Sequence, residues 1–70
     1  MNDQRKDIGL RLLKMRRRRG LSQLATAQRI GFSQEAYCAW ENGKRYPNGE
    51  ALIELANLFV CTTDYLLLGK

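Results

Sequence analysis

The stretch AQRIGFSQEAYCAWENGK, residues 27–44, limits the possible folds of this chain more than any other feature. Ser33 is a favourable N-cap residue, so a helix can begin directly after it and run to about Glu41. Gly31 can adopt the positive φ that ends a preceding helix at about Ile30. Because two helices this short are joined by so tight a turn, they cannot lie antiparallel with much contact, and we expect them to cross at a steep angle.

A further helix is predicted before this stretch. Residues 8–15 carry apolar side chains at i, i+4 and i+7, which is the spacing of one helical face. Asp3 or Asp7 can cap or charge the start of this helix, and Gly20 ends it. Ser22 is then a favourable N-cap for the first of the two short helices described above.

A loop and a fourth helix follow the stretch. Asn42-Gly43 ends the helix before it, since Gly is the usual residue just past a helix C-terminus. Residues 44–48 then form a loop, and Asn48 caps a helix with one apolar face. That face consists of Leu52, Leu55, Ala56 and Phe59.

A fifth, short helix is predicted at residues 64–68, capped by Thr62 or Thr63 and followed by Gly69. No linker or repeat interrupts the chain, strand patterning is weak, and 70 residues suffice for one small core. We therefore expect an all-α fold, a compact arrangement of five helices, in a single domain over residues 1–70.

The charge of the chain is basic and unevenly distributed. The formal net charge is +5, and the pI is about 9.7. Residues 1–29 hold nine Lys and Arg against two Asp, whereas residues 30–70 hold three Lys and Arg against five acidic residues. One face or end of the protein is therefore expected to be cationic. An anionic partner is favoured, and nucleic acid is the commonest.

The composition argues against several functions. There is no His, and Cys38 and Cys61 lie far apart without a C-x-x-C motif. We therefore predict no metal site, no catalytic residues, no cofactor and no small-molecule ligand. Free thiols are favoured over a disulfide between the two cysteines. No apolar run approaches the ~18 residues of a membrane span and the N-terminus has no signal-peptide core, so we expect a cytoplasmic protein without membrane contact.

The helix at residues 34–41 has two unlike faces. Tyr37 and Trp40, at i and i+3, are large and are expected in the core, although aromatic residues could also stack on bases. The opposite face is small or polar, and such a helix can enter a major groove and contact base edges without steric conflict. This face consists of Gln34, Glu35, Cys38 and Ala39.

The pattern GLSQ…A…IGFSQ…WENGK…P…L…LA…DYLL resembles that of the Cro/C1-type (XRE-like) helix-turn-helix domains of phage repressors and bacterial regulators. The resemblance covers roughly residues 5–69. It implies the five-helix, lambda-repressor-like fold of that family and binding to operator DNA, usually as a symmetric dimer.

The resemblance also implies base contacts for individual residues. Gln34, Glu35 and Ala39 correspond to base-reading positions, and Cys38 lies on the same face. The amide of Gln34 can pair with adenine N6 and N7, and the carboxylate of Glu35 can accept a hydrogen bond from cytosine N4. The methyl group of Ala39 can contact thymine. The alternative is that the first-turn residues Gln34 and Glu35 are simply solvated beside the N-cap.

Contacts to the DNA backbone are implied for a second set of residues. These residues are Gln23, Ser33, Asn42, Lys44 and Arg45. The alternative for Gln23 is that it is an ordinary helix-start residue. The alternative for Lys44 and Arg45 is that they are solvated charges in a loop. Residues 17–19 are a run of Arg side chains that point in different directions, so long-range attraction of DNA is favoured over direct contact.

Arg16 and Glu41 match a pair that forms a partly buried salt bridge in the family, between the first helix and the end of the third. This pair is therefore expected to contribute to structure rather than to direct DNA contact.

Several positions depart from the family's pattern. Thr26 stands where Leu is usual, and Leu24 stands where a charged residue is usual. Leu10 and Leu13 stand where polar residues are common. These leucines, together with Leu68, are either scattered surface residues or cover a dimer or partner surface.

Two functions are consistent with these features. The leading one is a sequence-specific, double-stranded DNA-binding transcriptional regulator, and repression is favoured because occluding a promoter needs no further surface. A homodimer on a near-palindromic operator, with half-sites ~34 Å apart, would add discrimination. The alternative is an antitoxin-like module that binds a protein partner through Leu10, Leu13 and Leu24 and also binds its own operator.

Overall fold

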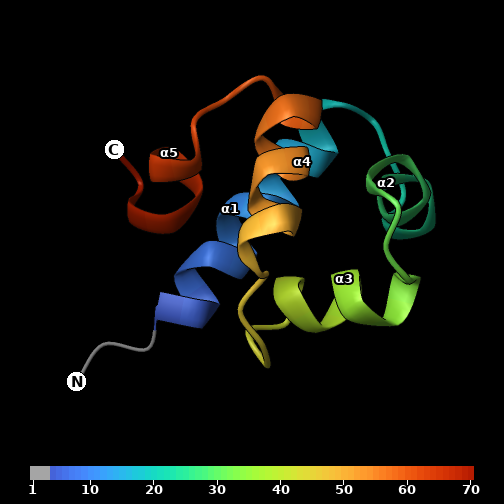
Figure 1. Cartoon of the computed structure of the whole chain (residues 1–70), viewed down its shortest axis with the longest axis horizontal. Coiled ribbons are helices and arrows are strands. Elements are labelled where there is room, and N and C mark those ends of the chain that lie inside the picture. The colour runs from blue at the N-terminus through green and yellow to red at the C-terminus, as the bar shows by residue number, and fades with distance from the viewer. Residues whose placement is uncertain (1–3) are drawn as a thin grey trace.

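The computed structural model describes residues 4–70, which form five α-helices and, within that range, no strand (Figure 1). The all-α fold predicted from the sequence is thus confirmed. None of these helices is long and apolar enough to cross a membrane. The helices are α1 (Gln4–Arg18), α2 (Gln23–Ile30), α3 (Gln34–Glu41), α4 (Gly49–Phe59) and α5 (Thr63–Leu68).

Helices α2 to α5 each begin at a capping side chain that the sequence predicts. In each case the side-chain oxygen accepts a hydrogen bond from the backbone N–H three residues on. The distances are 3.0 Å for Ser22, 3.1 Å for Ser33, 2.8 Å for Asn48 and 2.9 Å for Thr62. Thr62 is therefore the cap of α5, and Thr63 is the first residue of that helix.

The other helix ends are partly as predicted. Asp7 lies in the first turn of α1, where a negative charge is favourable; Asp3 lies outside the described residues. Gly20 and Gly31 follow α1 and α2 with φ of 66° and 78°. Val60 ends α4 with φ of 55°, although a β-branched residue is strained there by about 1–2 kcal/mol. The sequence does not reveal this strained end.

All five helices contribute side chains to the core; α3 packs against α1 and α2, α4 packs against α2 and α5, and α5 also packs against α1 (Figure 1). Tyr37 and Trp40 are buried within the core, and their rings meet edge to face with centroids 6.0 Å apart. Because both rings are buried, their prediction as core residues is confirmed and stacking on bases is not open to them. The buried apolar residues are Ile8, Leu12, Ala27, Ile30, Tyr37, Trp40, Ala51, Leu52, Leu55, Ala56, Phe59 and Leu66.

Helices α1 and α3 approach each other closely at Gly9. A Cβ atom at this position would lie 2.3 Å from the carbonyl oxygen of Glu41 and 2.6 Å from that of Trp40. Both neighbours are backbone atoms that cannot move aside alone. Gly9 therefore allows the C-terminal end of α3 to lie directly on α1.

Thr26 shows how one departure from the family's pattern is accommodated. Its side chain is fully buried, and its hydroxyl donates a hydrogen bond to the carbonyl of Ser22 at 2.8 Å. The buried polar atom is thus satisfied within its own helix. Leu24, on the other side of α2, is 47% exposed.

Candidate nucleic-acid interface

The turn between α2 and α3 sets the orientation of the candidate DNA-reading helix. Figure 1 shows α2 nearly end-on while α3 lies across the view, so the two helices cross steeply, as predicted. The N–H of Gly31 donates to the backbone carbonyl of Gln28 at 3.3 Å, and the N–H of Phe32 donates to that of Ala27 at 3.0 Å. The Phe32 ring then meets the Trp40 ring edge to face at 5.3 Å. Backbone and ring contacts together hold α3 against α2.

The predicted base-reading residues share the outward side of α3. Gln34 and Glu35 are exposed in its first turn, and Cys38 and Ala39 are partly exposed further along. Because the large side chains of this helix point into the core, small and polar groups are what it offers to a ligand. The hydroxyl of Ser33 accepts the capping hydrogen bond and remains exposed next to Gln34.

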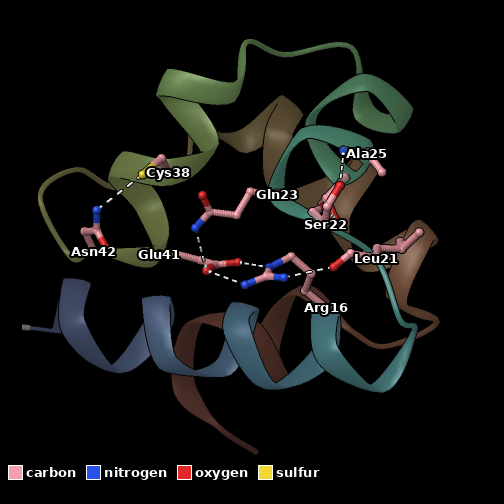
Figure 2. A network of polar contacts seen from close by, with 9 residues as sticks. Arg16, Leu21, Ser22, Gln23, Ala25, Cys38, Glu41 and Asn42 are labelled. Atoms are coloured by element: carbon pink, nitrogen blue, oxygen red, sulfur yellow. Dashed lines mark hydrogen bonds and ion pairs between the residues drawn. The ribbon is translucent and has the colours of Figure 1, made fainter.

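A polar network joins the start of α2, the end of α3 and the last turns of α1 (Figure 2). Arg16 Nε donates to Glu41 Oε2 at 2.6 Å, and Arg16 Nη2 donates to Glu41 Oε1 at 3.2 Å. Gln23 Nε2 donates to the same Oε1 at 3.0 Å, and Arg16 Nη1 donates to the carbonyl of Leu21 at 2.9 Å. The pair implied by the resemblance is thus present, and it extends to Gln23.

The network favours the charged forms of both partners. Burial opposes the charge of Glu41, whose side chain is 4% exposed in the ion pair. The hydrogen bonds that this carboxylate accepts, that from Arg16 foremost, outweigh burial and lower its pKa. The hydrogen bond to Glu41 raises the pKa of Arg16 in turn. A bidentate, charge-assisted pair of this kind is both strong and directional.

The loop after α3 carries the remaining candidate contacts. Lys44 and Arg45 are exposed. Arg5, on α1, donates to the carbonyl of Lys44 at 3.4 Å and lies over the Tyr46 ring, 5.9 Å from its centroid. At the start of the loop, the Asn42 amide donates to the sulfur of Cys38 at 3.4 Å (Figure 2). Arg5 thus holds the backbone from which Lys44 projects.

Three features of this interface were missed by the sequence predictions. The first is Gly9, which an isolated glycine within a helical pattern could have indicated. The second is the hydrogen bond from Gln23 to Glu41, for which no local pattern exists. The third is Arg5 beside the loop, a contact between residues that lie 39 positions apart in the chain.

Other predicted residues lie outside this interface. Residues 17–19 are exposed at the end of α1 and its following turn. Cys61 is likewise outside it, and both Cys61 and Cys38, which lies on the outward side of α3, are free thiols, as predicted. Within residues 4–70 there is no group of His, Cys, Asp and Glu side chains that could hold a metal ion.

Two short helices crossing at a glycine turn, the second with its aromatic side buried and its polar side outward, define a helix-turn-helix unit. The model of a family described as helix-turn-helix domain matches residues 9–70. The chain belongs to this family, whose domains are of the XRE type, and the resemblance predicted from the sequence is confirmed.

The similar proteins include regulators of transcription. Repressor protein C2 of Salmonella phage P22 is 36% identical over 62 residues, which cover 89% of this chain and 29% of C2. The HTH-type transcriptional regulator AnsR of Bacillus subtilis is 40% identical over 57 residues, which cover 81% of this chain and 49% of AnsR. The chain therefore spans about half the length of these curated relatives, or less.

A solved structure is similar along nearly its whole length. It is the crystal structure of the P22 c2 repressor protein in complex with synthetic operator 9T in the presence of Tl+. The TM-score is 0.86 and the identity 35%, with 90% of this chain and 96% of that chain covered. The predicted five-helix, lambda-repressor-like fold is thereby confirmed.

Proposed function

We propose that this protein is a sequence-specific, double-stranded DNA-binding regulator of transcription, and that it acts as a repressor in the cytoplasm. The observation that supports this most is the outward side of α3, where exposed Gln34 and Glu35 stand opposite a buried aromatic side. A rigid helix with polar groups and small side chains outward fits a major groove. The net charge of +5 favours approach to the phosphate backbone.

We assign base discrimination to the side chains of α3. Most of the binding affinity is assigned to residues around α3 that contact phosphates. Gln34 pairs with adenine, Glu35 accepts from cytosine, and Ala39 and Cys38 contact apolar or weakly polar base edges. Phosphate contacts fall to Gln23, Ser33, Asn42, Lys44 and Arg45. A Gln amide has two N–H bonds. Because one N–H of Gln23 is directed to Glu41, the other is held ready for a phosphate oxygen.

We further propose that the protein binds its operator as a homodimer. One α3 reads only a few base pairs, which is too few to single out a site in a genome. Two copies related by a two-fold axis would read a near-palindrome with half-sites ~34 Å apart.

A second role, in protein binding, is supported by the exposed leucines. Leu10 is 62% exposed and Leu24 47%, and Leu13 is partly exposed beside Leu10. Leu10 and Leu13 line one shallow depression on α1, whereas Leu24, on α2, does not line it. We propose that the Leu10 and Leu13 surface binds protein. In an antitoxin-like module the same surface would hold a protein partner while α3 binds the module's own operator.

The test of DNA binding is selection from random duplex DNA at moderate salt, followed by affinity measurement of the winner against scrambled DNA. We expect an enriched site with two-fold symmetry, bound ~10³-fold or more over scrambled DNA. Lys44→Ala and Arg45→Ala should each weaken binding to all sequences alike and reduce the salt slope by about one. Arg29→Ala, an exposed change on α2 away from the proposed contacts, is the matched control.

Other outcomes of this selection would redirect the proposal. Absence of any enriched site, with weak and salt-sensitive binding only, would refute sequence-specific recognition and leave the protein-binding role. An enriched site without symmetry would refute the homodimer and leave recognition by α3 in place.

A further inference from the structure

The outward side of α1 is both apolar and cationic. A shallow depression there is lined by Leu10, Leu13, Lys14, Arg17 and Arg18. Within residues 4–70, no hydrogen bond or ion pair engages the side chains of Lys14, Arg17 or Arg18. We call this surface the α1 face. Exposed leucines surrounded by unpaired cations favour a partner surface that is apolar and acidic.

The outward side of α4 has the opposite charge. Glu50, Ile53, Glu54 and Asn57 recur at i, i+3, i+4 and i+7, and all four are exposed. Ile53 is 58% exposed, and Val60, directly past the end of the helix, is 75% exposed. We call this surface the α4 face. It presents two carboxylates around apolar side chains, and so complements the α1 face in both charge and apolar character.

The two faces point away from each other. Helix α1 buries Ile8 and Leu12, and helix α4 buries Leu52 and Leu55, in the same core. In Figure 1, α4 lies in front of α1, so the outward sides of the two helices lie on opposite sides of the molecule. They cannot meet within one copy, but they can meet between copies that stack head to tail.

We propose that the α1 face of one copy binds the α4 face of the next, so that the partner of Leu10 and Leu13 is a second copy of this chain. The proposal rests on the protein-binding role proposed above for these leucines and is independent of DNA binding. A two-fold contact between two α1 faces would set the three cations of each against those of the other, which disfavours it. The contact involves one helix of each copy, so it is small and weak in free solution. The contact forms more readily where copies are held close together, as on neighbouring sites of one DNA, because their effective concentration is higher there.

Charge reversal tests the contact on the whole chain without DNA. Sedimentation velocity is measured over a range of concentrations at about 0.01 M salt, where the Debye length is about 30 Å. The α1-reversed variant is Lys14→Glu with Arg17→Glu, and the α4-reversed variant is Glu50→Lys with Glu54→Lys. We expect the unmodified protein to form species beyond a dimer. Each reversed variant alone should associate at least about tenfold more weakly, because its two faces now carry like charge.

The decisive measurement is an equimolar mixture of the two reversed variants. In the mixture the acidic α1 face of one variant meets the basic α4 face of the other, so association beyond the dimer should return. Arg29→Glu and Asp64→Lys, which reverse exposed charges outside both faces, should associate as the unmodified protein does. Circular dichroism checks that each variant keeps its helices.

Four outcomes would overturn the proposal. One is a mixture that does not regain association, and another is an equal loss in the control variants. The third is binding of the α1 face only to an added glutamate-rich amphipathic peptide, which would identify a different protein as the partner. Association that stops at the dimer and ignores both reversals would refute the head-to-tail contact and leave an operator-binding dimer intact. Selection of DNA by the reversed variants reports separately on the proposed DNA function.

Discussion

The two ends of α3 differ in almost every physical respect. At the C-terminal end, Glu41 is held by Arg16 and Gln23, and its backbone lies directly on Gly9. At the N-terminal end, Gln34 is exposed and has no hydrogen-bond partner for its side chain within residues 4–70. One end of the same short helix is fixed to another helix, while the other end projects into solvent.

This difference separates positioning from recognition. A reading side chain must be free to meet a base, but its backbone must be held within a fraction of an ångström to do so. Contacts at the Glu41 end can orient the whole helix because α3 is only eight residues long. Changes at the fixed end should therefore alter stability, and changes at the free end should alter only binding.

The largest effect is expected from Gly9→Ala. The added methyl group would lie 2.3 Å from the carbonyl oxygen of Glu41, so α1 and α3 must separate. Overpacking against backbone should lower the free energy of unfolding by about 3 kcal/mol. Chemical denaturation of the variant and of the unmodified protein measures this change in the free energy of unfolding. Gly49→Ala is the matched control, since nothing lies within 4 Å of its added Cβ, and its effect should stay within about 0.5 kcal/mol. Equal effects of the two substitutions would contradict the close approach of α1 and α3.

The second largest effect is expected from Arg16→Ala. This change leaves the Glu41 carboxylate nearly buried and without its cationic partner, although the Gln23 amide still donates to it. Removing one partner of a fully buried pair costs about 3–5 kcal/mol. Because this pair is only partly buried, we expect a smaller loss of about 2–3 kcal/mol in the free energy of unfolding. Arg17→Ala removes an exposed Arg with no such partner and should cost less than about 0.5 kcal/mol. If Arg16→Ala weakened DNA binding without changing the melting temperature, the structural role of the pair would be wrong.

A smaller effect is expected from acid, through the same carboxylate. The pKa of Glu41 is lowered in the folded protein, so its contribution is fully present above its unfolded pKa, near the ordinary 4.5. That contribution is lost as the pH falls through the lowered folded pKa. The loss should be on the order of 1 kcal/mol, the difference between charged and neutral hydrogen bonds.

Glu41→Gln isolates this contribution, because an amide keeps the shape of the side chain without titrating. The free energy of unfolding of this variant should fall less steeply than that of the unmodified protein as the pH drops below about 4.5. Glu54→Gln, at an exposed carboxylate that forms no hydrogen bond or ion pair within residues 4–70, is the matched control for the loss of one carboxylate. Parallel acid curves for Glu41→Gln and the unmodified protein would show that the pair is not the titrating element.

The fixed and free ends of α3 also differ in how far the sequence predicts them. The free end follows from local chemistry: Gly31 ends one helix, Ser33 caps the next, and the side chains that follow are polar. Each of these signals lies within a few residues of the structure that it determines. The outward side of α3 can therefore be predicted in full from the amino-acid sequence.

The fixed end depends on contacts between distant parts of the chain. The sequence indicates the Arg16 and Glu41 pair through resemblance, not through spacing, because the two residues are 25 positions apart. It does not indicate that Gln23 joins them, or that Gly9 admits the Glu41 backbone. Such contacts depend on how helices are placed relative to one another, and periodicity within one helix contains no information on that.

The smallest effect on stability is expected from Gln34→Ala. This substitution is also the most direct test of the difference between the fixed and free ends of α3. The side chain is exposed and unpaired within the described residues, so the free energy of unfolding should change by less than about 0.5 kcal/mol. Binding should nevertheless lose about 1–3 kcal/mol of discrimination at one base pair of the selected site. Gln28→Ala, an exposed change on α2, should alter neither quantity. The measurement is a titration of each variant against operators changed one base pair at a time. If Gln34→Ala leaves the ranking of these operators unchanged, then α3 does not read bases through its free end, and the division between positioning and recognition fails.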